Sequence, residues 1–495
     1  MEINDFEIGW LYILDSGRWL GKKTELKKIA KNMFDKVRIF EGIIRYFTAK
    51  EIEDHSASKE KAFFYMKSSK FKEILDLFYK SDMDNIDPEY LENLQFFRAK
   101  LTGFELVLPD KRVEPIDVRL LFHSSGIFIL EFWLKLKNMA LTPEMINELQ
   151  LLPREEEEIT LKLPRKLLKD YSLIKPEIAN LLKASSGGED EPITLNLTFY
   201  ELVWIYWGIV AYIATNEKAK NSKQLRGLLR YNVFHFYPVL LFHFPDFTSI
   251  EDLFNQYKAE LYSMSTQEIY SKLEYLRTEF MDEMFDSKNN LADRTDYALY
   301  FNIESCLHLY TKNSKSALEY IAKRRSISVE NQILLEKLEV VLPLELLQIQ
   351  RFILMMFDSI LSKKSISEMD TDELAQMRGH LSKAIEEFHN IKLMVKTITI
   401  ARCDKGRESF KLDKALGALE KKLEFVDSAV SSIHNNLMEF LSILIGILVT
   451  IGPIIATTIG PSYPIIGSII IFGFVLGVYF LYKQIYKIWY RKKKI

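Results

Sequence analysis

The sequence lacks the motifs that mark the commoner classes of enzyme and metalloprotein. It contains no glycine-rich phosphate loop, no HExxH zinc motif and no Gly-x-Ser-x-Gly nucleophile turn. The eight histidines are dispersed, and the carboxylates form no pattern that separates a catalytic pair from the charge of helix surfaces. We therefore predict no catalytic residue, no cofactor and no metal site, and we expect that the chain is not an enzyme.

Cysteine is scarce and charge of one sign is not in excess. The two cysteines, Cys306 and Cys403, lie far apart, which excludes a disulfide framework and fits a reducing compartment. The formal net charge is −2, so a nucleic acid polymer is not an expected partner. The acidic segment Met1–Glu7 has neither the apolar run of a secretory signal nor the arginines of a transit peptide, so we expect this region to be cytoplasmic.

Charge is missing altogether from one long segment near the C-terminus. From Phe440 to Tyr482 there is no Asp, Glu, Lys or Arg. A membrane-spanning helix needs about 20 apolar residues. The sequence therefore predicts two transmembrane helices, at 438–459 and 464–482, separated by a turn that contains Gly460, Pro461 and Ser462. The alternative is a buried helical hairpin in a large protein without a membrane part.

The segment that follows, 483–495, is basic and aromatic. Its cations alternate with rings that suit a membrane interface, and positive charge marks the cytoplasmic side of a span. The lipid bilayer is thus an expected partner, with both termini cytoplasmic. The residues concerned are Lys483, Lys487, Arg491, Lys492, Lys493 and Lys494, with Tyr482, Tyr486, Trp489 and Tyr490.

The segment before the first predicted span has the most regular periodicity in the chain. Apolar residues at alternating steps of three and four predict a coiled-coil seam that needs a helical partner. A second helix with this spacing is expected from 374 to 398, joined to the first by a polar turn at Arg402–Arg407. Self-association would cover the rest of the seam, and an ordinary helical subdomain is the alternative. The seam residues are Leu412, Leu416, Leu419, Leu423, Val426, Val430, Ile433 and Leu437.

The remaining sequence predicts an α+β region. We expect residues 1–100 to be mostly helical, with one strand at Ile8–Leu14. The apolar stretch Leu197–Ala214 contains Glu201 and is interpreted as a buried core helix rather than a span. Ser124–Gly126 predicts a hairpin turn, and Thr142 with Pro143 predicts a helix start. Further strands are expected at 104–108, 118–122, 127–136, 158–163, 193–197, 233–236, 240–244 and 305–310.

The predicted fold class is thus an α+β cytoplasmic domain, a long coiled-coil-like helical stalk and two C-terminal transmembrane helices. The predicted domains are a mostly helical region, an α+β ligand-sensing region, the stalk, the transmembrane pair and the basic tail. Their bounds are 1–100, 101–325, 326–437, 438–482 and 483–495.

Two basic clusters are candidates for binding a small anionic ligand that carries a ring. Cations and aromatic side chains together can hold such a ligand by charge and stacking. Ordinary surface charge is the alternative for each cluster. The first consists of Lys223, Arg226, Arg230, Tyr231 and His235, and the second of Lys323, Arg324 and Arg325.

Polar residues on the first predicted span are candidates for lining a pore. Asn436, Thr450 and Thr457 are separated by multiples of seven and fall near one line of a helix. Ile443 interrupts the line and could form an apolar constriction. The alternative is that the threonine hydroxyls bond to carbonyls one turn back.

Two C-terminal spans, a very short outer loop, a long helix entering the membrane and a cytoplasmic α+β domain together resemble the CorA family of ion channels and transporters. The resemblance covers residues 290–495. It implies a homopentamer whose first span lines a pore. The family's Gly-Met-Asn signature corresponds here to Gly460, Pro461 and Ser462, of which only the glycine matches, so the resemblance does not carry magnesium selectivity.

The large N-terminal region and the missing signature are similar to the CorA-like effectors found beside type III CRISPR systems. That resemblance implies a prokaryotic inner-membrane, multi-pass protein of antiviral defence. It also implies a nucleotide second messenger as ligand, a conjugate of S-adenosylmethionine and AMP. The leading hypothesis is therefore an oligomeric channel gated by a small cytoplasmic ligand. A constitutive divalent-cation transporter and a membrane-anchored scaffold or enzyme are the alternatives.

Overall fold

The computed structural model describes most of the chain up to Thr458. All structural statements below concern these residues: 3–16, 26–46, 62–86, 96–108, 110–154, 156–184, 191–215, 235–267, 278–363, 378–379, 382, 385–386, 388–389 and 396–458.

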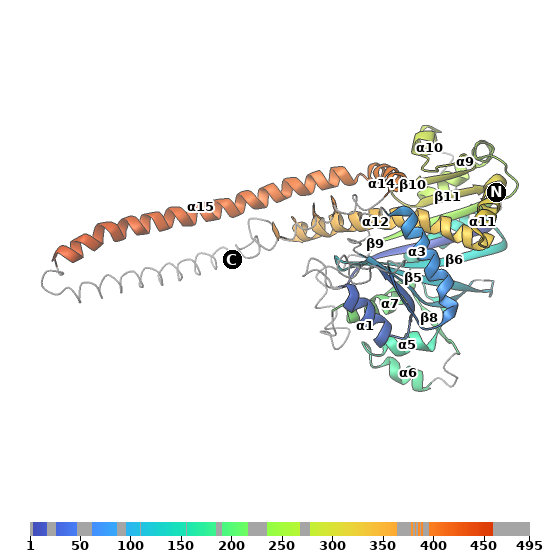
Figure 1. Cartoon of the computed structure of the whole chain (residues 1–495), viewed down its shortest axis with the longest axis horizontal. Coiled ribbons are helices and arrows are strands. Elements are labelled where there is room, and N and C mark those ends of the chain that lie inside the picture. Colours follow the sequence, from blue (N-terminus) through green and yellow to red (C-terminus); the bar gives the residue numbers. More distant parts are fainter. Residues whose placement is uncertain are drawn as a thin grey trace, which may run out of the picture. The chain divides into compact units, whose positions relative to one another are not determined.

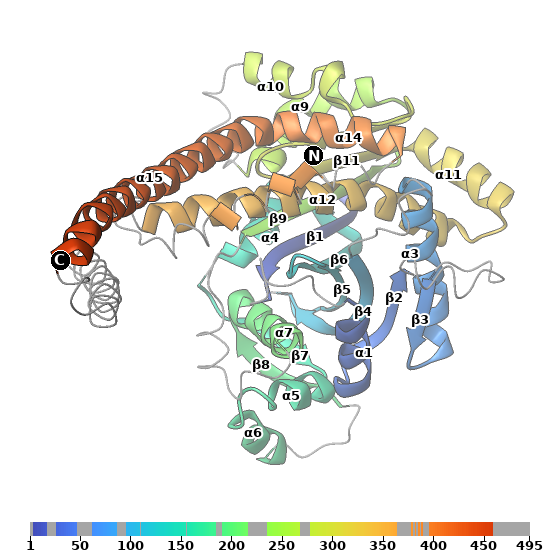
Figure 2. The same ribbon diagram turned by 60° about the vertical axis from the view of Figure 1, so that its left-hand side comes forward.

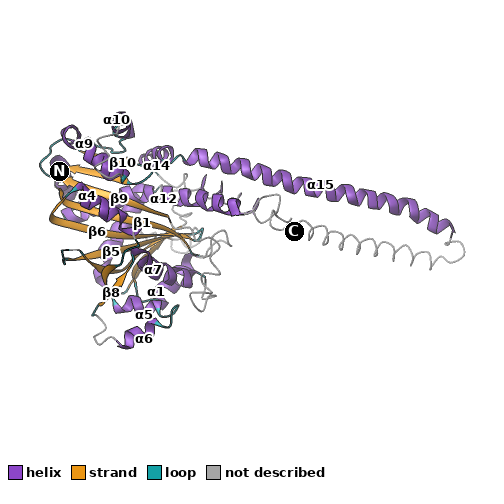
Figure 3. Ribbon diagram, turned by 180° about the vertical axis from the view of Figure 1, so that it is seen from behind, coloured by secondary structure: helices purple, strands orange, loops and turns teal. Residues whose placement is uncertain are grey.

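One mixed sheet of eleven strands organises the fold (Figures 1 and 3). The main path runs β10-β11-β9-β1-β6-β5-β4-β2-β3, while β7 pairs with β4 and with β8. Among the described strands, β11 and β9 are the one parallel pair. The strands are β1 (Ile3–Asp15), β2 (Phe40–Tyr46), β3 (Ala62–Met66), β4 (Phe96–Val107), β5 (Val113–His123), β6 (Ile127–Leu141), β7 (Ile159–Leu163), β8 (Ile193–Leu197), β9 (His235–Phe244), β10 (Tyr297–Phe301) and β11 (Cys306–Thr311).

Some helices lie between the strands in the chain, and others follow the last strand. They are α1 (Leu26–Lys36), α3 (Lys72–Asn85), α4 (Pro143–Leu151), α5 (Arg165–Tyr171), α6 (Ile178–Ala184), α7 (Phe199–Ala214), α9 (Ile250–Thr266), α10 (Thr278–Met284), α11 (Lys312–Arg325), α12 (Val329–Lys363), α14 (Thr397–Ser409) and α15 (Leu412–Thr458). Short 3-10 turns are η1 (Ser69–Phe71), η3 (Leu152–Arg154) and η5 (Ser287–Asn289).

Side-chain alternation gives the sheet two unlike faces. One face buries Phe6, Ile8 and Trp10 of β1 with Phe132 of β6, and it packs on α1, α5 and α7. The opposite face carries the alternate residues, many of them charged, and α12 crosses it (Figure 2). A half-buried antiparallel sheet presents alternate residues to opposite sides, so this division follows from the period of two.

Several local predictions are confirmed. Ser124–Gly126 turns between β5 and β6, with Gly126 at a φ of 90°. Thr142 caps α4, with Pro143 at its first position. The apolar stretch after Leu197 forms α7, which begins with a capping box and is buried along most of its length. The predicted strands at 233–236 and 240–244 are one continuous strand, β9.

Two compact units divide the chain. The first consists of residues 1–353 and 387–413, and the second of 354–386 and 414–495. The whole sheet, α14 and most of α12 belong to the first unit. Most of α15 belongs to the second, where Leu416, Leu419 and Val426 of the predicted seam are buried and Leu423 and Val430 are half-buried.

The fold class needs correction in its membrane part. Among the residues that the structure describes, no helix combines the length and the apolar character needed to cross a membrane. The prediction of two transmembrane helices is therefore wrong on this finding. The first predicted span instead continues α15, whose preceding turns carry charges from Asp413 to Glu439. The second predicted span, the outer turn Gly460–Ser462 and the basic tail lie outside the described residues.

Two further predictions are corrected. Residues 1–100 are not mostly helical, because they supply β1, β2, β3 and the start of β4 beside α1 and α3. The segment Arg402–Arg407 is not a turn but part of α14, and the chain turns after it, at Phe410 and Lys411. Its polar residues suggested a loop, but several of them are held by partners in the fold. Most of the helix expected at 374–398 lies outside the described residues.

Candidate functional site: the cavity beside the α14–α15 turn

A buried ionic cluster fixes α12 on the charged face of the sheet. Arg98 of β4 donates to both carboxylate oxygens of Glu345 on α12, at 2.9 and 2.6 Å. Its Nε also donates to Asp82 of α3 at 3.0 Å, and Asp82 accepts the hydroxyl of Tyr46. Arg98, Asp82 and Glu345 are all nearly or fully buried. Burial raises the pKa of Glu345 and of Asp82, while Arg98 opposes both shifts.

A second buried cation, Lys337 of α12, pairs with a different strand of the sheet. Lys337 of α12 forms an ion pair with Glu7 of β1, and its ammonium lies 4.1 Å from the ring centre of Trp133. Burial lowers the pKa of Lys337 to about 8, against the opposing effect of Glu7. Between these pairs, Glu131 accepts the indole N–H of Trp133 at 2.8 Å. Helix α12 is thus attached to the sheet through paired charges.

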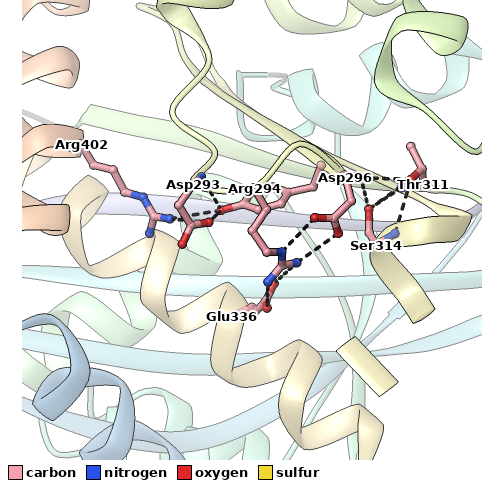
Figure 4. A network of polar contacts seen from close by, with 8 residues as sticks. Asp293, Arg294, Asp296, Thr311, Ser314, Glu336 and Arg402 are labelled. Atoms are coloured by element: carbon pink, nitrogen blue, oxygen red, sulfur yellow. Dashed lines mark hydrogen bonds and ion pairs between the residues drawn. The ribbon is translucent and has the colours of Figure 1, made fainter. Parts of the chain in front are cut away.

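Helix α14 is held at its N-terminal half by polar contacts with three parts of the first unit. Lys396, which caps it, donates its backbone N–H to the carbonyl of Asn85 at 2.8 Å, and Thr399 donates to the Asn85 side chain at 2.8 Å. Figure 4 shows Arg402 directed at Asp293, 3.6 Å away. Arg402 also donates to the hydroxyl of Tyr297 at 3.2 Å.

The same network extends to α12 and α11 (Figure 4). Arg294 pairs with Glu336 of α12 at 2.7 Å and with Asp296 at 3.0 Å. The backbone carbonyl of Asp296 accepts the hydroxyls of Thr311 and Ser314 at the start of α11. The segment directly before β10, which contains Asp293, Arg294 and Asp296, therefore contacts α11, α12 and α14.

Close packing positions the second half of α14. A Cβ added to Gly406 would lie 2.4 Å from Leu347 of α12 and 3.1 Å from Phe301 of β10. Phe410, directly after the helix, stacks edge-on against Tyr237 of β9, and the guanidinium of Arg351 lies over its ring. A larger residue at this position would therefore require Leu347 to shift.

At this end of α14 lies a cavity of about 410 Å³, a size typical of small-molecule sites. Its walls come from α9, α10, η5, the β10–β11 hairpin, α14 and Lys411, all within the first unit. They combine aromatic rings, amides, hydroxyls and charges of both signs. The lining residues are Tyr262, Ser265, Thr266, Phe280, Glu283, Met284, Asn289, Tyr300, Phe301, Asn302, Ile303, Glu304, Lys405, Glu408, Ser409 and Lys411.

The hairpin turn between β10 and β11 forms a rigid side of the cavity. The amide of Asn302 donates to Ser265 of α9 at 2.5 Å, and its carbonyl accepts the Tyr237 hydroxyl at 2.7 Å. Ser305 donates to the Ser265 carbonyl at 2.6 Å, and Arg351 donates to the Ile303 carbonyl at 3.0 Å. Such a preorganised wall loses little conformational entropy when a ligand binds.

Charge in the cavity is balanced rather than strongly positive. Lys405 pairs with Glu408 at 2.6 Å, and Glu304 pairs with Arg154 at 3.5 Å. This leaves Lys411 and Glu283, both exposed and neither in an ion pair among the described residues. Burial raises the pKa of the Tyr300 phenol, so this ring is neutral and offers a stacking surface. The site suits an aromatic ligand that carries both a positive and a negative group.

The predicted ligand residues are not brought together in this cavity. Lys223, Arg226, Arg230 and Tyr231 lie outside the described residues. His235 begins β9, bonds to Gln348 of α12 at 3.1 Å, and has its pKa lowered to about 3 by burial and then by Arg351. It therefore has the role of a neutral, packed side chain.

The second predicted cluster forms the last turn of α11. Lys323, Arg324 and Arg325 are exposed, and Arg325 lies 3.8 Å from Glu339 and 3.9 Å from Asp84. Cations in a last turn also interact favourably with the helix dipole. These contacts agree with the surface-charge alternative for this cluster.

The four predicted pore residues all lie in α15. Ile443 is 58 % exposed in the single chain. Thr450 donates its hydroxyl to the Gly446 carbonyl at 2.7 Å, which is the intrahelical alternative. Asn436 and Thr457 belong to the same helix, but their side chains lie outside the described set, as does the whole of Gly460–Ser462. Pore lining stays a prediction.

Sequence reasoning missed the cavity because its residues come from six separate segments. The sequence also predicted a turn at Arg402–Arg407, where the structure has α14, so Lys405 was not recognised as part of a cavity wall. Among the described residues, no group of three or more His, Cys, Asp or Glu side chains could hold a metal ion. Compared with known proteins, the chain matches no family model, no curated protein and no solved structure.

Proposed function

We propose that the chain is a ligand-gated effector. A small nucleotide-like ligand binds the cavity beside the α14–α15 turn, and the helical unit that begins beyond this turn carries the output. As the resemblance to CorA-like proteins implies, the output is ion conduction by a homo-oligomer at a membrane, in antiviral defence. The observation that carries the proposal is the cavity itself, which combines aromatic rings, amides and charges of both signs at the C-terminal end of α14.

The chemistry of the lining supports a nucleotide-like ligand. Tyr300 and Phe280 offer ring faces, and Phe280 is 52 % exposed, so it can cover a bound base. Lys411 can pair with a phosphate, and Glu283 with a cationic group. A conjugate of S-adenosylmethionine and AMP carries a ring, a sulfonium cation and a phosphate anion, which correspond to these three kinds of group.

The position of the cavity supports gating. A ligand shifts an equilibrium only if it binds one state better than the other. Lys405 and Ser409 of α14 line the cavity, and α15 begins three residues after Ser409. A ligand that contacts both α14 and the fixed hairpin at Asn302 can therefore favour one position of α14. Helix α14 is the element whose two positions the proposal requires.

Ligand binding can be tested with the full-length chain and matched variants. The probes are the S-adenosylmethionine–AMP conjugate, AMP, S-adenosylmethionine and Mg²⁺, measured by calorimetry. Lys411→Glu and Phe280→Ser, both in the cavity, should each weaken conjugate binding about tenfold, or about 1.4 kcal/mol. Lys315→Glu and Tyr320→Ser also reverse a charge and remove an aromatic ring, but at exposed positions of α11, and should leave binding unchanged. Equal effects in both pairs would contradict the cavity assignment.

The output needs a separate measurement. The chain would be reconstituted in liposomes that contain an ion-sensitive dye, and flux would be recorded with and without the conjugate. The proposal predicts flux only with ligand, and loss of that flux in Lys411→Glu. Magnesium flux that is equal with and without ligand would indicate a constitutive transporter instead. Binding without any flux would retain the sensor and overturn ion conduction as its output.

A further inference from the structure

A second cavity, separate from the ligand site, has a lining of a different kind. It measures about 790 Å³ and lies between the ends of β4 and β6, α4, η3 and the start of β7. Its floor is apolar and includes Leu108, Leu136 and Leu141, which are all largely buried. Within the described residues, this cavity and the ligand cavity share no lining residue.

Its rim is acidic. Glu148, Glu157 and Glu158 are exposed and have no ion-pair partner among the described residues. Asp110 also lines the rim but pairs with Arg112 at 2.6 Å, and Lys111 is the single cation among the described lining residues. An apolar pocket with three unpaired carboxylates at its mouth fits a segment with large apolar side chains flanked by cations.

The chain itself contains a segment of this chemistry. Residues 482–495 carry Lys483, Lys487 and the run Arg491–Lys494, without any acidic residue, and interleave them with Tyr482, Tyr486, Trp489 and Tyr490. Aromatic anchors in an apolar pocket with cations on an acidic rim are the usual arrangement of strong peptide contacts. We propose that this basic aromatic segment of a second copy docks in the acidic cavity.

Exposed apolar residues on α15 favour a second copy as the source. Phe425 is 67 % exposed in the single chain, and Met438, Ile443 and Ile447 are 49 %, 58 % and 46 % exposed. A helix with such residues on its surface favours association with another helix. Copies joined in this way would hold many basic segments near many acidic cavities, which raises the effective concentration of each.

Site-directed cross-linking between full-length copies tests this proposal. One copy carries Glu157→Cys and one tag, and the other carries Tyr490→Cys and a different tag. The natural cysteines, Cys306 and Cys403, are buried. Oxidation of the mixture should give a product that contains both tags. Its yield should be at least tenfold above that with Glu177→Cys, an exposed acidic position away from the cavity.

A charge exchange separates docking from a chance encounter. Lys492→Glu, Lys493→Glu and Lys494→Glu together should lower the yield about tenfold, and adding Glu148→Lys and Glu158→Lys to the other copy should restore it. Circular dichroism would establish that each variant is folded. Equal yields from Glu157→Cys and Glu177→Cys, or no restoration by the exchange, would overturn the proposal. A further variant carries both Glu157→Cys and Tyr490→Cys in one chain. If cross-links form only within this chain, and not between copies, docking between copies is overturned.

Discussion

The two faces of the central sheet are built on different physical principles. The face under α7 is a continuous apolar layer, in which Trp10, Phe132 and Phe199 pack ring against ring. The face under α12 is joined by buried ion pairs, above all Arg98 with Glu345 and Lys337 with Glu7. An apolar layer gains stability from area and tolerates small shifts, whereas buried ion pairs depend on exact placement.

The apolar face therefore acts mainly as a scaffold, whereas the ionic face defines the position of α12. Replacing a buried ion pair by apolar residues often leaves stability unchanged, but removing one partner is strongly destabilising. The pairs under α12 therefore specify where α12 lies. Because α14 packs on α12 through Gly406, the position of α12 also determines where the α14 wall of the ligand cavity lies.

The largest expected effect comes from breaking the ionic face. Arg98→Met leaves Asp82 and Glu345 buried without their cation, so the free energy of unfolding should fall by about 3–5 kcal/mol. The combination Asp82→Asn, Arg98→Met, Glu131→Gln and Glu345→Met removes these charges and that of Glu131, which lies 3.8 Å from Arg98, and should recover most of this loss. Urea titration followed by circular dichroism measures both. A quadruple variant as unstable as the single one would show that the charges are not the cause.

The ionic face should also respond to pH. The folded-state pKa of Lys337 is lowered to about 8 from 10.5, so above pH 8 the unfolded state binds more protons and stability rises with pH. Relative to Lys337→Met, the natural chain should gain about 2 kcal/mol between pH 8 and pH 9.5. The measurement is urea unfolding at a series of pH values. Phe132→Leu on the apolar face should lower the free energy of unfolding by the same amount at every pH in the series.

A smaller effect is expected where α14 approaches α12. Gly406→Ala places a methyl group 2.4 Å from Leu347 and should lower the free energy of unfolding by about 1–2 kcal/mol, overpacking outweighing the gain in helix propensity. Gly417→Ala in α15 meets no atom within 4 Å and should stabilise by about 0.5–1 kcal/mol. Thermal melts compare the two. The same sign for both would mean that α14 does not pack as closely as described.

The smallest effect concerns the exposed cations of α11. Lys323→Ser with Arg324→Ser should change the free energy of unfolding by less than about 0.5 kcal/mol, because neither side chain is buried. Conjugate binding should also be unchanged. A tenfold loss of binding would return the ligand site to the cluster predicted from the sequence.

Local features of the fold could be predicted from the sequence, because their causes are local. The hairpin turn at Gly126, the cap at Thr142 and the core helix after Leu197 each depend on a few neighbouring residues. Strand order could not be predicted, because pairings such as Phe6 with Phe242 join distant segments. The charged strands under α12 also hid part of the sheet, since Arg98 and Asp117 do not suggest buried strand positions.

The ligand clusters predicted from the sequence and the candidate cavity differ in how their residues are spaced along the chain, and ligand binding at either stays a prediction. Clusters such as Lys323–Arg325 are contiguous in sequence, and contiguity on a helix end places cations in solvent. The cavity instead assembles single residues, such as Asn289, Asn302 and Lys411, from segments that spread over about 150 positions of the chain. The uncharged run after Phe440 was interpreted as two spans from its length, the turn at Gly460–Ser462 and the basic segment that follows. In the structure, its first part continues α15, whose earlier turns are charged.

Hydrogen–deuterium exchange of the full-length chain tests the central claim most directly. Amide exchange would be compared with and without the S-adenosylmethionine–AMP conjugate. Ligand in the cavity should protect peptides from the hairpin around Asn302 and from the end of α14 near Ser409, and should change exchange at the start of α15. Protection confined to the peptide around Lys223–Tyr231, with exchange at α14 unchanged, would contradict the account.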